Sequence, residues 1–310
     1  MTAKLGHGNV RFMSSANIYQ VVTDRILAAL AQNIVPWQKP WRTSAPTNLL
    51  SKKAYRGVNV LLLSCSGYSS HYWGTYKQIT EAGGQVRRGE KGTPIVFWSM
   101  FEKMVDGKPK TVFVLRQYTV FNVEQCDGLE ALKTAPSDLQ APMAHEALES
   151  AAAAILEGYK GAPQVIVGYN RTKACYKPSL DVVEVPGREY FNSPEGFYST
   201  LYHELAHSTG HKSRLGRIGV TDVDAFGSHR YSFEELVAEI TSAFMMHHVG
   251  LDSEAAFENQ AAYIQGWRAK LGENPKWIVD AAGKAAKAFE HILGVSAATL
   301  PADEEISEAA

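Results

Sequence analysis

"NSPEGFYSTLYHELAHSTGH", residues 192–211, has the spacing H-E-x-x-H near its centre. Ser193 can cap a helix whose first residue is Pro194, because a serine oxygen accepts a hydrogen bond from a free backbone N–H group and proline needs no donor there. His203 and His207 are four residues apart on that helix, so both imidazoles project from one face. The stretch predicts a helix that presents two histidines to one metal ion.

Glu204 stands one position round the same helix, where its carboxylate can take a proton from a water molecule at the site. A catalytic site of this kind needs a third ligand. The metzincin spacing, H-E-x-x-H-x-x-G-x-x-H, places a histidine at position 213, but Ser213 occupies that position even though Gly210 is present. The metzincin class is therefore excluded.

A second helix, predicted over "SFEELVAEITSAFMM" at 232–246, offers two glutamates. Glu235 and Glu239 are four residues apart on it and share a face. Because the other contacts of this helix are apolar, two carboxylates there need a cation or a histidine partner. Glu235 with Ser232 also fits a capping box, which would instead make it a helix-start residue. The string E-x-x-A-E resembles the third-ligand helix of gluzincin peptidases, which implies that Glu235 binds metal and Glu239 orients a ligand histidine; the reverse assignment stays open.

Two histidines, one carboxylate and an open fourth position are typical of a catalytic zinc site. Zn²⁺ is the expected cofactor, and Mn²⁺ or Co²⁺ suits the same donors. Such an ion polarises a peptide carbonyl while Glu204 moves the proton, so a zinc metallopeptidase is the expected activity. The alternative is two surface histidines without a metal. His229, Tyr231 and Tyr263 are candidates for stabilising an oxyanion, and the sequence assigns none of them.

The net charge of −1 conceals two halves of opposite charge. Residues 1–125 contain 16 Lys and Arg against 6 Asp and Glu, a balance of +10, and the remaining 15 against 26 give −11. A chain of 310 residues with this asymmetry is expected to hold two domains with different partners. We expect a basic domain at 1–130, a polar linker at 131–142, a metallopeptidase-like domain at 143–298 and an acidic, disordered tail at 299–310.

Helical and strand patterns alternate in the basic half. Residues 16–35 have a helical apolar period that ends at Pro36, whereas the apolar run 58–63 fits either a helix or a buried strand. Residues 93–101 and 110–123 alternate around the turn signal "DGK", which predicts a hairpin.

The acidic half also mixes helices with strands. Residues 143–159 are an alanine-rich helical stretch, and "QVIVGY" and "LDVVEVP" are predicted as short strands. The expected fold class is therefore α+β in two domains. No apolar run is long enough to span a membrane, and the N-terminus lacks the apolar core of a signal peptide, so a cytoplasmic location without a membrane partner is expected.

Aromatic side chains are interleaved with cations in the basic half. A single strand offers bases that stack on aromatic rings, worth about 1–3 kcal/mol per base, and phosphates that attract Lys and Arg. The plainer interpretation is that the tryptophans are core residues and the cations only aid solubility. With the charge balance of +10 we expect single-stranded DNA binding without sequence specificity. The candidate contacts are Trp37, Lys39, Trp41, Arg42, Lys52, Lys53, Tyr55, Arg56, Trp73, Tyr76, Lys77, Arg87, Arg88 and Lys91.

Taken together, these motifs resemble the ArdC-type plasmid antirestriction proteins. "PWQKPWR", "PTNLLSKKAYRGVNVLLLS" and "TYKQITEAGGQVRRGEKG" are similar to their N-terminal domain, which TraC-type plasmid primases share. "LYHELAHSTGHKSRLGR" and "FGSHRYSFEELVAEITSAF" are similar to their metallopeptidase domain, which is related to SprT/Spartan-like enzymes. The resemblance covers about residues 16–295.

The resemblance implies a plasmid-encoded protein that binds the single strand entering a recipient cell in conjugation and protects it from restriction. Its metal residues map onto His203, His207 and Glu235 or Glu239, with Glu204 as the catalytic residue. Proteins bound to the same DNA are candidate substrates. Two other functions compete: a non-enzymatic single-strand shield whose metal site is idle or structural, and an accessory protein of plasmid replication.

Overall fold

A computed structural model describes residues 15–37, 45–105, 108–133, 145–169, 172–221, 229–251 and 260–295. Helices and strands are mixed in both halves, which confirms the α+β class. The candidate positions Lys39, Trp41 and Arg42, most of the expected linker and the whole expected acidic tail lie outside the described residues.

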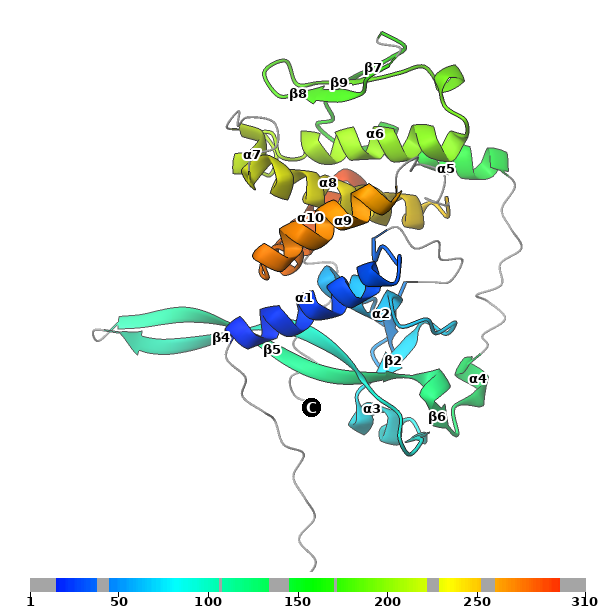
Figure 1. Ribbon diagram of the computed structural model, residues 1–310, viewed down its shortest axis with the longest axis vertical. Helices are drawn as coiled ribbons and strands as arrows, with labels where there is room; N and C mark the ends of the chain where they lie inside the picture. The colour runs from blue at the N-terminus through cyan, green and yellow to red at the C-terminus, as the bar shows by residue number, and fades with distance from the viewer. Residues whose placement is uncertain are drawn as a thin grey trace, which may run out of the picture.

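The N-terminal half is built around one long hairpin. Strands β4 (Thr93–Val105) and β5 (Lys108–Asn122) pair antiparallel along their whole length, and the hairpin projects to one side of the molecule (Figure 1). Two short strands, β1 (Thr47–Asn48) and β2 (Tyr72–Gly74), extend the sheet in the order β1-β2-β5-β4. A separate antiparallel pair joins β3 (Gln85–Val86) to β6 (Cys126–Asp127). The hairpin predicted from alternation is confirmed.

Helices of different lengths pack around these strands. They are α1 (Ser15–Ala31), α2 (Val58–Ser64), α3 (Tyr76–Glu81) and α4 (Glu130–Lys133). The ambiguous apolar run is α2, and it shows no alternation because nearly all of its residues are buried. Its buried Asn59 accepts a hydrogen bond from the backbone N–H of Val96 and donates one to the Val96 carbonyl, both at 2.8 Å. One side chain thus completes the backbone pairing of the edge strand β4 and holds α2 against it.

The C-terminal half stacks helices beneath a small sheet (Figure 1). The sheet has the order β7-β9-β8, in which β7 (Gln164–Val167) runs parallel to β9 (Val182–Val185) and β8 (Cys175–Lys177) runs antiparallel to it. The sequence analysis did not predict β8. The helices are α5 (His145–Gly158), α6 (Pro194–Ser208), α7 (Ile218–Thr221), α8 (His229–His248), α9 (Gln260–Glu273) and α10 (Trp277–Leu293).

One hydrophobic core joins the two halves. Helix α1 contacts α9 and α10, and α2 contacts α10 (Figure 1). The core takes its N-terminal members mainly from α1 and α2, among them Ile26, Leu30, Leu61 and Leu62, and its C-terminal members from α8, α9 and α10, among them Leu236, Ile240, Leu271 and Ile278. Neither half therefore covers its own apolar faces completely.

Candidate metal centre and nucleic-acid interface

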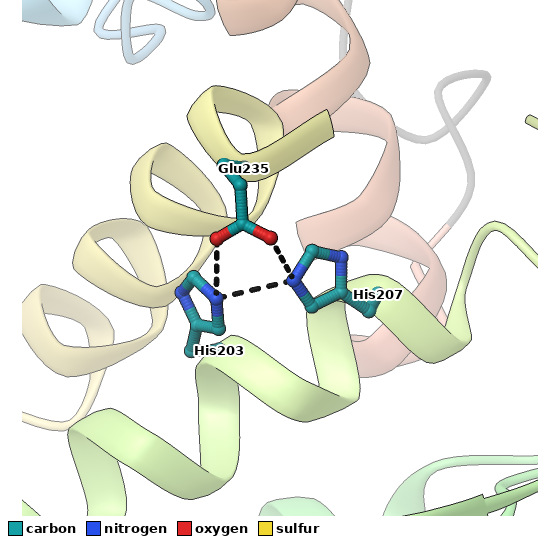
Figure 2. A group of neighbouring side chains, drawn as sticks. All are labelled: His203, His207 and Glu235. Carbon is teal, nitrogen blue, oxygen red and sulfur yellow. Dashed lines mark hydrogen bonds and ion pairs between the residues drawn. The ribbon is translucent and has the colours of Figure 1, made fainter. Parts of the chain in front are cut away.

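Three side chains from two helices converge on one point. Ser193 Oγ accepts a hydrogen bond from the N–H of Gly196 at 3.2 Å and starts α6, as predicted. His203 and His207 then face each other on successive turns of α6, with their Nε2 atoms 3.1 Å apart. Glu235 of α8 spans the pair: one carboxylate oxygen is 3.4 Å from His203 Nε2 and the other is 3.5 Å from His207 Nε2 (Figure 2).

The spacing of these three donors fits a small divalent cation. Zinc bonds of about 2.0–2.1 Å to nitrogen and oxygen, arranged as a tetrahedron, place neighbouring ligands about 3.3 Å apart. The three observed separations of 3.1, 3.4 and 3.5 Å match that value. A search of the described residues for three or more histidine, cysteine or acidic side chains close enough together to hold a metal finds this group. The donor set is two imidazoles and one carboxylate, with the remaining position left for water or substrate.

A glutamate that sequence analysis missed orients one imidazole. His207 Nδ1 lies 3.5 Å from Glu234 Oε1, which is close to, though long for, a hydrogen bond. A proton on Nδ1, facing this carboxylate, leaves the Nε2 lone pair for the metal. Glu234 is buried, and Arg217 is paired with it from the loop after α6. The Arg217 Nε–H group donates to both Glu234 oxygens at 2.9 and 3.1 Å.

Arg217 also fixes the end of α6. Its guanidinium donates to Thr209 Oγ1 at 2.6 Å and to the Ala206 carbonyl at 2.8 Å. The three nitrogens of its guanidinium thus bind both the Glu234 carboxylate behind His207 and the last turn of α6. The sequence did contain one signal of the Arg217–Glu234 pair. Glu234 is a second glutamate beside Glu235 in an otherwise apolar helix, and a buried carboxylate requires a cationic partner.

The cluster carries charge even without a metal. Burial lowers the pKa of His207, but hydrogen bonds to Glu234 and Glu235 outweigh burial and raise that pKa to about 10. Burial raises the pKa of Glu235, whereas its hydrogen bonds to His203 and His207 hold it well below the usual range. A cation bound here would therefore replace a proton, because a ligating imidazole must be neutral.

The remaining predicted residues surround this group. Glu204 is buried on α6, one position from His203. Glu239 lies one turn beyond Glu235 on α8 but outside the group of three; it accepts a hydrogen bond from Tyr263. Since α8 already includes His229, Ser232 is interior and the capping-box interpretation of Glu235 is wrong.

The three candidates for oxyanion stabilisation lie in different places. Tyr231 hydrogen-bonds to Glu235, and burial together with the charges of Glu235 and Glu204 raises its pKa. His229 instead meets Asn274 Oδ1 at 2.9 Å and the ring of Trp277, away from the ligands. Tyr231 is therefore the candidate for which a hydrogen bond to one of the three converging side chains is seen.

Several predicted DNA contacts are core residues, which corrects the sequence analysis. Trp37 and Trp73 are each 2% exposed and Tyr55 is 6% exposed, so their rings cannot stack on bases. Composition misassigned them because a tryptophan among cations looks the same whether it faces the core or solvent. Arg56, which is half-exposed, is ion-paired with Glu290 of α10 and ties the two halves together.

Other candidates do lie at the surface. Tyr76 is 58% exposed at the start of α3, where Lys77 is exposed beside it. Lys52 is exposed and places its ammonium 4.1 Å from the ring centre of Tyr72. Lys53 is half-buried, whereas Arg87, Arg88 and Lys91 are exposed, and Arg87 pairs with Glu90 at 2.8 Å. Trp98 of β4, which the sequence analysis did not single out, is 50% exposed.

Known proteins match both halves of the chain. Residues 16–121 match the family model of the N-terminal domain of anti-restriction factor ArdC, and residues 156–284 match the model of a zincin-like metallopeptidase. The crystal structure of the antirestriction protein ArdC from plasmid R388, in its metal-free form, is 36% identical with a TM-score of 0.70, over 90% of this chain and 99% of that one. The chain belongs to the ArdC antirestriction family.

Other ArdC-like chains extend the comparison. The Mn(II)-bound structure of R388 ArdC gives a TM-score of 0.71 at 36% identity, over 89% of this chain and 97% of that one. An uncharacterised protein of Sinorhizobium fredii, y4eC, is 33% identical over 87% of this chain and 89% of its own length. The DNA primase TraC of Escherichia coli is 34% identical over 89% of this chain, but the match spans only 27% of the primase. None of the helices that the structure describes is long and apolar enough to cross a membrane.

Proposed function

We propose that this ArdC-family protein binds single-stranded DNA entering a recipient cell in conjugation, acts in the cytoplasm against restriction, and carries a metal-dependent peptidase centre. The convergence of His203, His207 and Glu235 at tetrahedral ligand spacing is the observation that carries the enzymatic part. Zn²⁺ fits the donor set best, and the Mn(II)-bound relative supports Mn²⁺ as a second candidate.

Each side chain around the proposed metal ligands has a separate role in the proposed hydrolysis. A bound cation would supply Lewis acidity, polarising a peptide carbonyl and making water more acidic. Glu204 takes the proton from the attacking water and passes it to the leaving amine. Glu234 holds His207 in the tautomer that presents Nε2. Tyr231 offers a hydroxyl next to Glu235, where it can donate to the oxygen on which negative charge develops.

The DNA-binding surface proposed here is smaller than the set predicted from the sequence. It consists of exposed cations, two exposed aromatic residues and the half-buried Tyr72 of the N-terminal half: Lys52, Tyr72, Tyr76, Lys77, Arg87, Arg88, Lys91 and Trp98. Phosphates bind the cations, and bases stack on the exposed rings. Proteins bound to the same strand are the substrates that we propose for the peptidase centre.

Two substitutions at α3 test this surface in the full-length protein. Tyr76→Ala removes a stacking ring, and we expect it to weaken single-stranded DNA binding by about 1–3 kcal/mol with little change in duplex binding. Lys77→Ala should weaken both forms and lower the salt dependence of binding. Fluorescence anisotropy with a labelled oligonucleotide measures both, with Tyr169→Ala, another exposed tyrosine but in the C-terminal half, as the matched control. Equal losses in Tyr76→Ala and Tyr169→Ala would contradict the assignment.

Glu204→Ala tests the enzymatic part of the proposal. The substitution should abolish cleavage of a DNA-bound protein, and cleavage by the unaltered protein should rise when single-stranded DNA brings enzyme and target together. DNA affinity should not change, because Glu204 lies on α6 and belongs to no part of the DNA surface. Cleavage that survives the substitution would rule out the proposed proton transfer.

The same variant separates antirestriction from peptidase activity. Loss of protection of transferred DNA in Glu204→Ala would mean that protection requires cleavage. Full protection would favour the alternative function, a single-strand shield with an idle centre. The match to TraC keeps a role as a replication accessory as a further candidate, and a DNA-synthesis assay with plasmid template would detect it.

A further inference from the structure

A tryptophan of the N-terminal half reaches into the metal-binding half. Trp37 follows α1 and is 2% exposed. Its Nε1–H group donates a hydrogen bond to the hydroxyl oxygen of Tyr263 on α9, at 3.0 Å. The rings of Trp37 and Trp267 pack nearly perpendicular to each other, with 6.1 Å between ring centres and an interplanar angle of 88°. Packing and a directed hydrogen bond therefore fix Trp37 relative to Tyr263.

Tyr263 also hydrogen-bonds to the carboxylate of Glu239. A phenol has one proton to donate, and Tyr263 donates it to Glu239 while its oxygen accepts from Trp37 and Trp267. The phenol remains protonated, because burial and the charge of Glu239 raise its pKa well above the ordinary value. The hydrogen bonds thus run in one direction, from the indole through the phenol to the carboxylate.

Glu239 ends this chain of hydrogen bonds beside the metal ligands. It lies on α8 one turn after Glu235, and its electrostatic partners are His203, Glu235 and His207. It stays outside the group of three converging donors. A carboxylate next to a ligand histidine stabilises a cation at that site and fixes the position of the imidazole, and its own position depends on the donors that hold it.

We infer that Trp37 is a positioning residue for the metal centre, acting through Tyr263 and Glu239. The N-terminal half of the protein thereby sets part of the metal affinity of the C-terminal half. The inference rests on the proposed function only in requiring that His203, His207 and Glu235 bind a metal. It assigns a role to Trp37, which the sequence analysis placed on DNA and which the structure packs in one core with α8 and α9.

Conservative substitutions remove the hydrogen bonds and leave an aromatic ring at each position. Trp37→Phe deletes the indole donor, Tyr263→Phe deletes the hydroxyl, and the double variant deletes both. We expect Tyr263→Phe to weaken Mn(II) binding about tenfold and Trp37→Phe to weaken it about threefold. The double variant should match Tyr263→Phe alone, because Trp37 acts through Tyr263. Isothermal titration of the full-length protein measures these affinities.

Trp277→Phe is the matched control. Trp277 belongs to the same core and packs its ring against His229 and Phe233, so its loss should lower thermal stability and leave the Mn(II) affinity unchanged. The visible absorption of Co(II) bound at the site provides a second readout, since it reports ligand geometry rather than stability. We expect it to change in Tyr263→Phe and Trp37→Phe and not in Trp277→Phe.

The outcomes separate the inference from the proposed function. Unchanged Mn(II) affinity in Tyr263→Phe or in Trp37→Phe would overturn the inference, and so would additive losses in the double variant, which indicate independent packing effects. If Trp37→Phe does not fold, Tyr263→Phe decides the case because it removes a single oxygen atom. Absence of Mn(II) binding in the unaltered protein would overturn the proposed function and the inference with it.

Discussion

Residues 1–133 produced alone should fail to form a cooperatively folded unit. In the whole chain α1 and α2 pack against α9 and α10, so buried residues such as Ile26, Leu30, Leu61 and Leu62 would lose their cover. Burial of one such side chain is worth about 1.5–3 kcal/mol, and a typical domain is stable by only about 5–15 kcal/mol. Exposing four of them therefore removes most or all of the stability of the fragment.

Urea unfolding followed by near-ultraviolet circular dichroism tests this expectation. The fragment should show no cooperative transition and should bind a hydrophobic dye, whereas the full-length chain should unfold cooperatively. Mixing the fragment with residues 134–310 should restore the transition, because the two pieces together rebuild the shared core. A sharp transition in the fragment alone would show that the N-terminal half folds independently of α8, α9 and α10.

Arg217→Ala should destabilise the protein by about 3–5 kcal/mol, because it leaves the buried carboxylate of Glu234 without its cation. The side chains of Arg217 and Glu234 are 6% and 5% exposed, so water cannot replace the lost partner. The substitution also removes the hydrogen bonds to Thr209 and to the Ala206 carbonyl at the end of α6. Urea unfolding of metal-free protein measures the loss without interference from metal binding.

Two further variants serve as controls for Arg217→Ala. Arg217→Met with Glu234→Gln should recover much of the stability, since no unpaired charge remains and the amide oxygen can still face His207. Lys133→Ala breaks the exposed pair of Lys133 with Glu130, which lies at 3.2 Å, and should cost no more than about 1 kcal/mol. A cost for Arg217→Ala as small as that for Lys133→Ala would contradict the buried-pair account.

The features of the candidate metal centre that depend on residues close in sequence could be predicted, and those that depend on tertiary packing could not. The spacing of His203 and His207 and the cap at Ser193 act within one helix, so the sequence predicts their geometry directly. The choice between Glu235 and Glu239 depends on how far α8 is rotated against α6, which is a tertiary property. The role of Arg217 was not predicted. Arg217 lies in the loop after α6 whereas its partner Glu234 lies on α8, and nothing within that loop indicates a buried ion pair.

The nucleic-acid surface was less predictable, for a different physical reason. The composition of the basic half gives the number of charged and aromatic side chains, but it does not show which of them are buried in the folded protein. Trp37 and Trp73 lie in the core while Tyr76 and Trp98 lie at the surface, although all four occur in the same basic half. The packing of α1 and of the hairpin decides the difference, and it depends on contacts between residues far apart in the sequence.

The metal content of the purified protein tests the central claim most directly. After incubation with Zn(II) or Mn(II) and dialysis, elemental mass spectrometry should find about one equivalent of metal in the unaltered protein and none above background in His203→Ala/His207→Ala. Glu235→Ala should lose more metal than Glu239→Ala, because only Glu235 lies within ligand spacing of both imidazoles. One full equivalent retained in the double histidine variant would contradict the account.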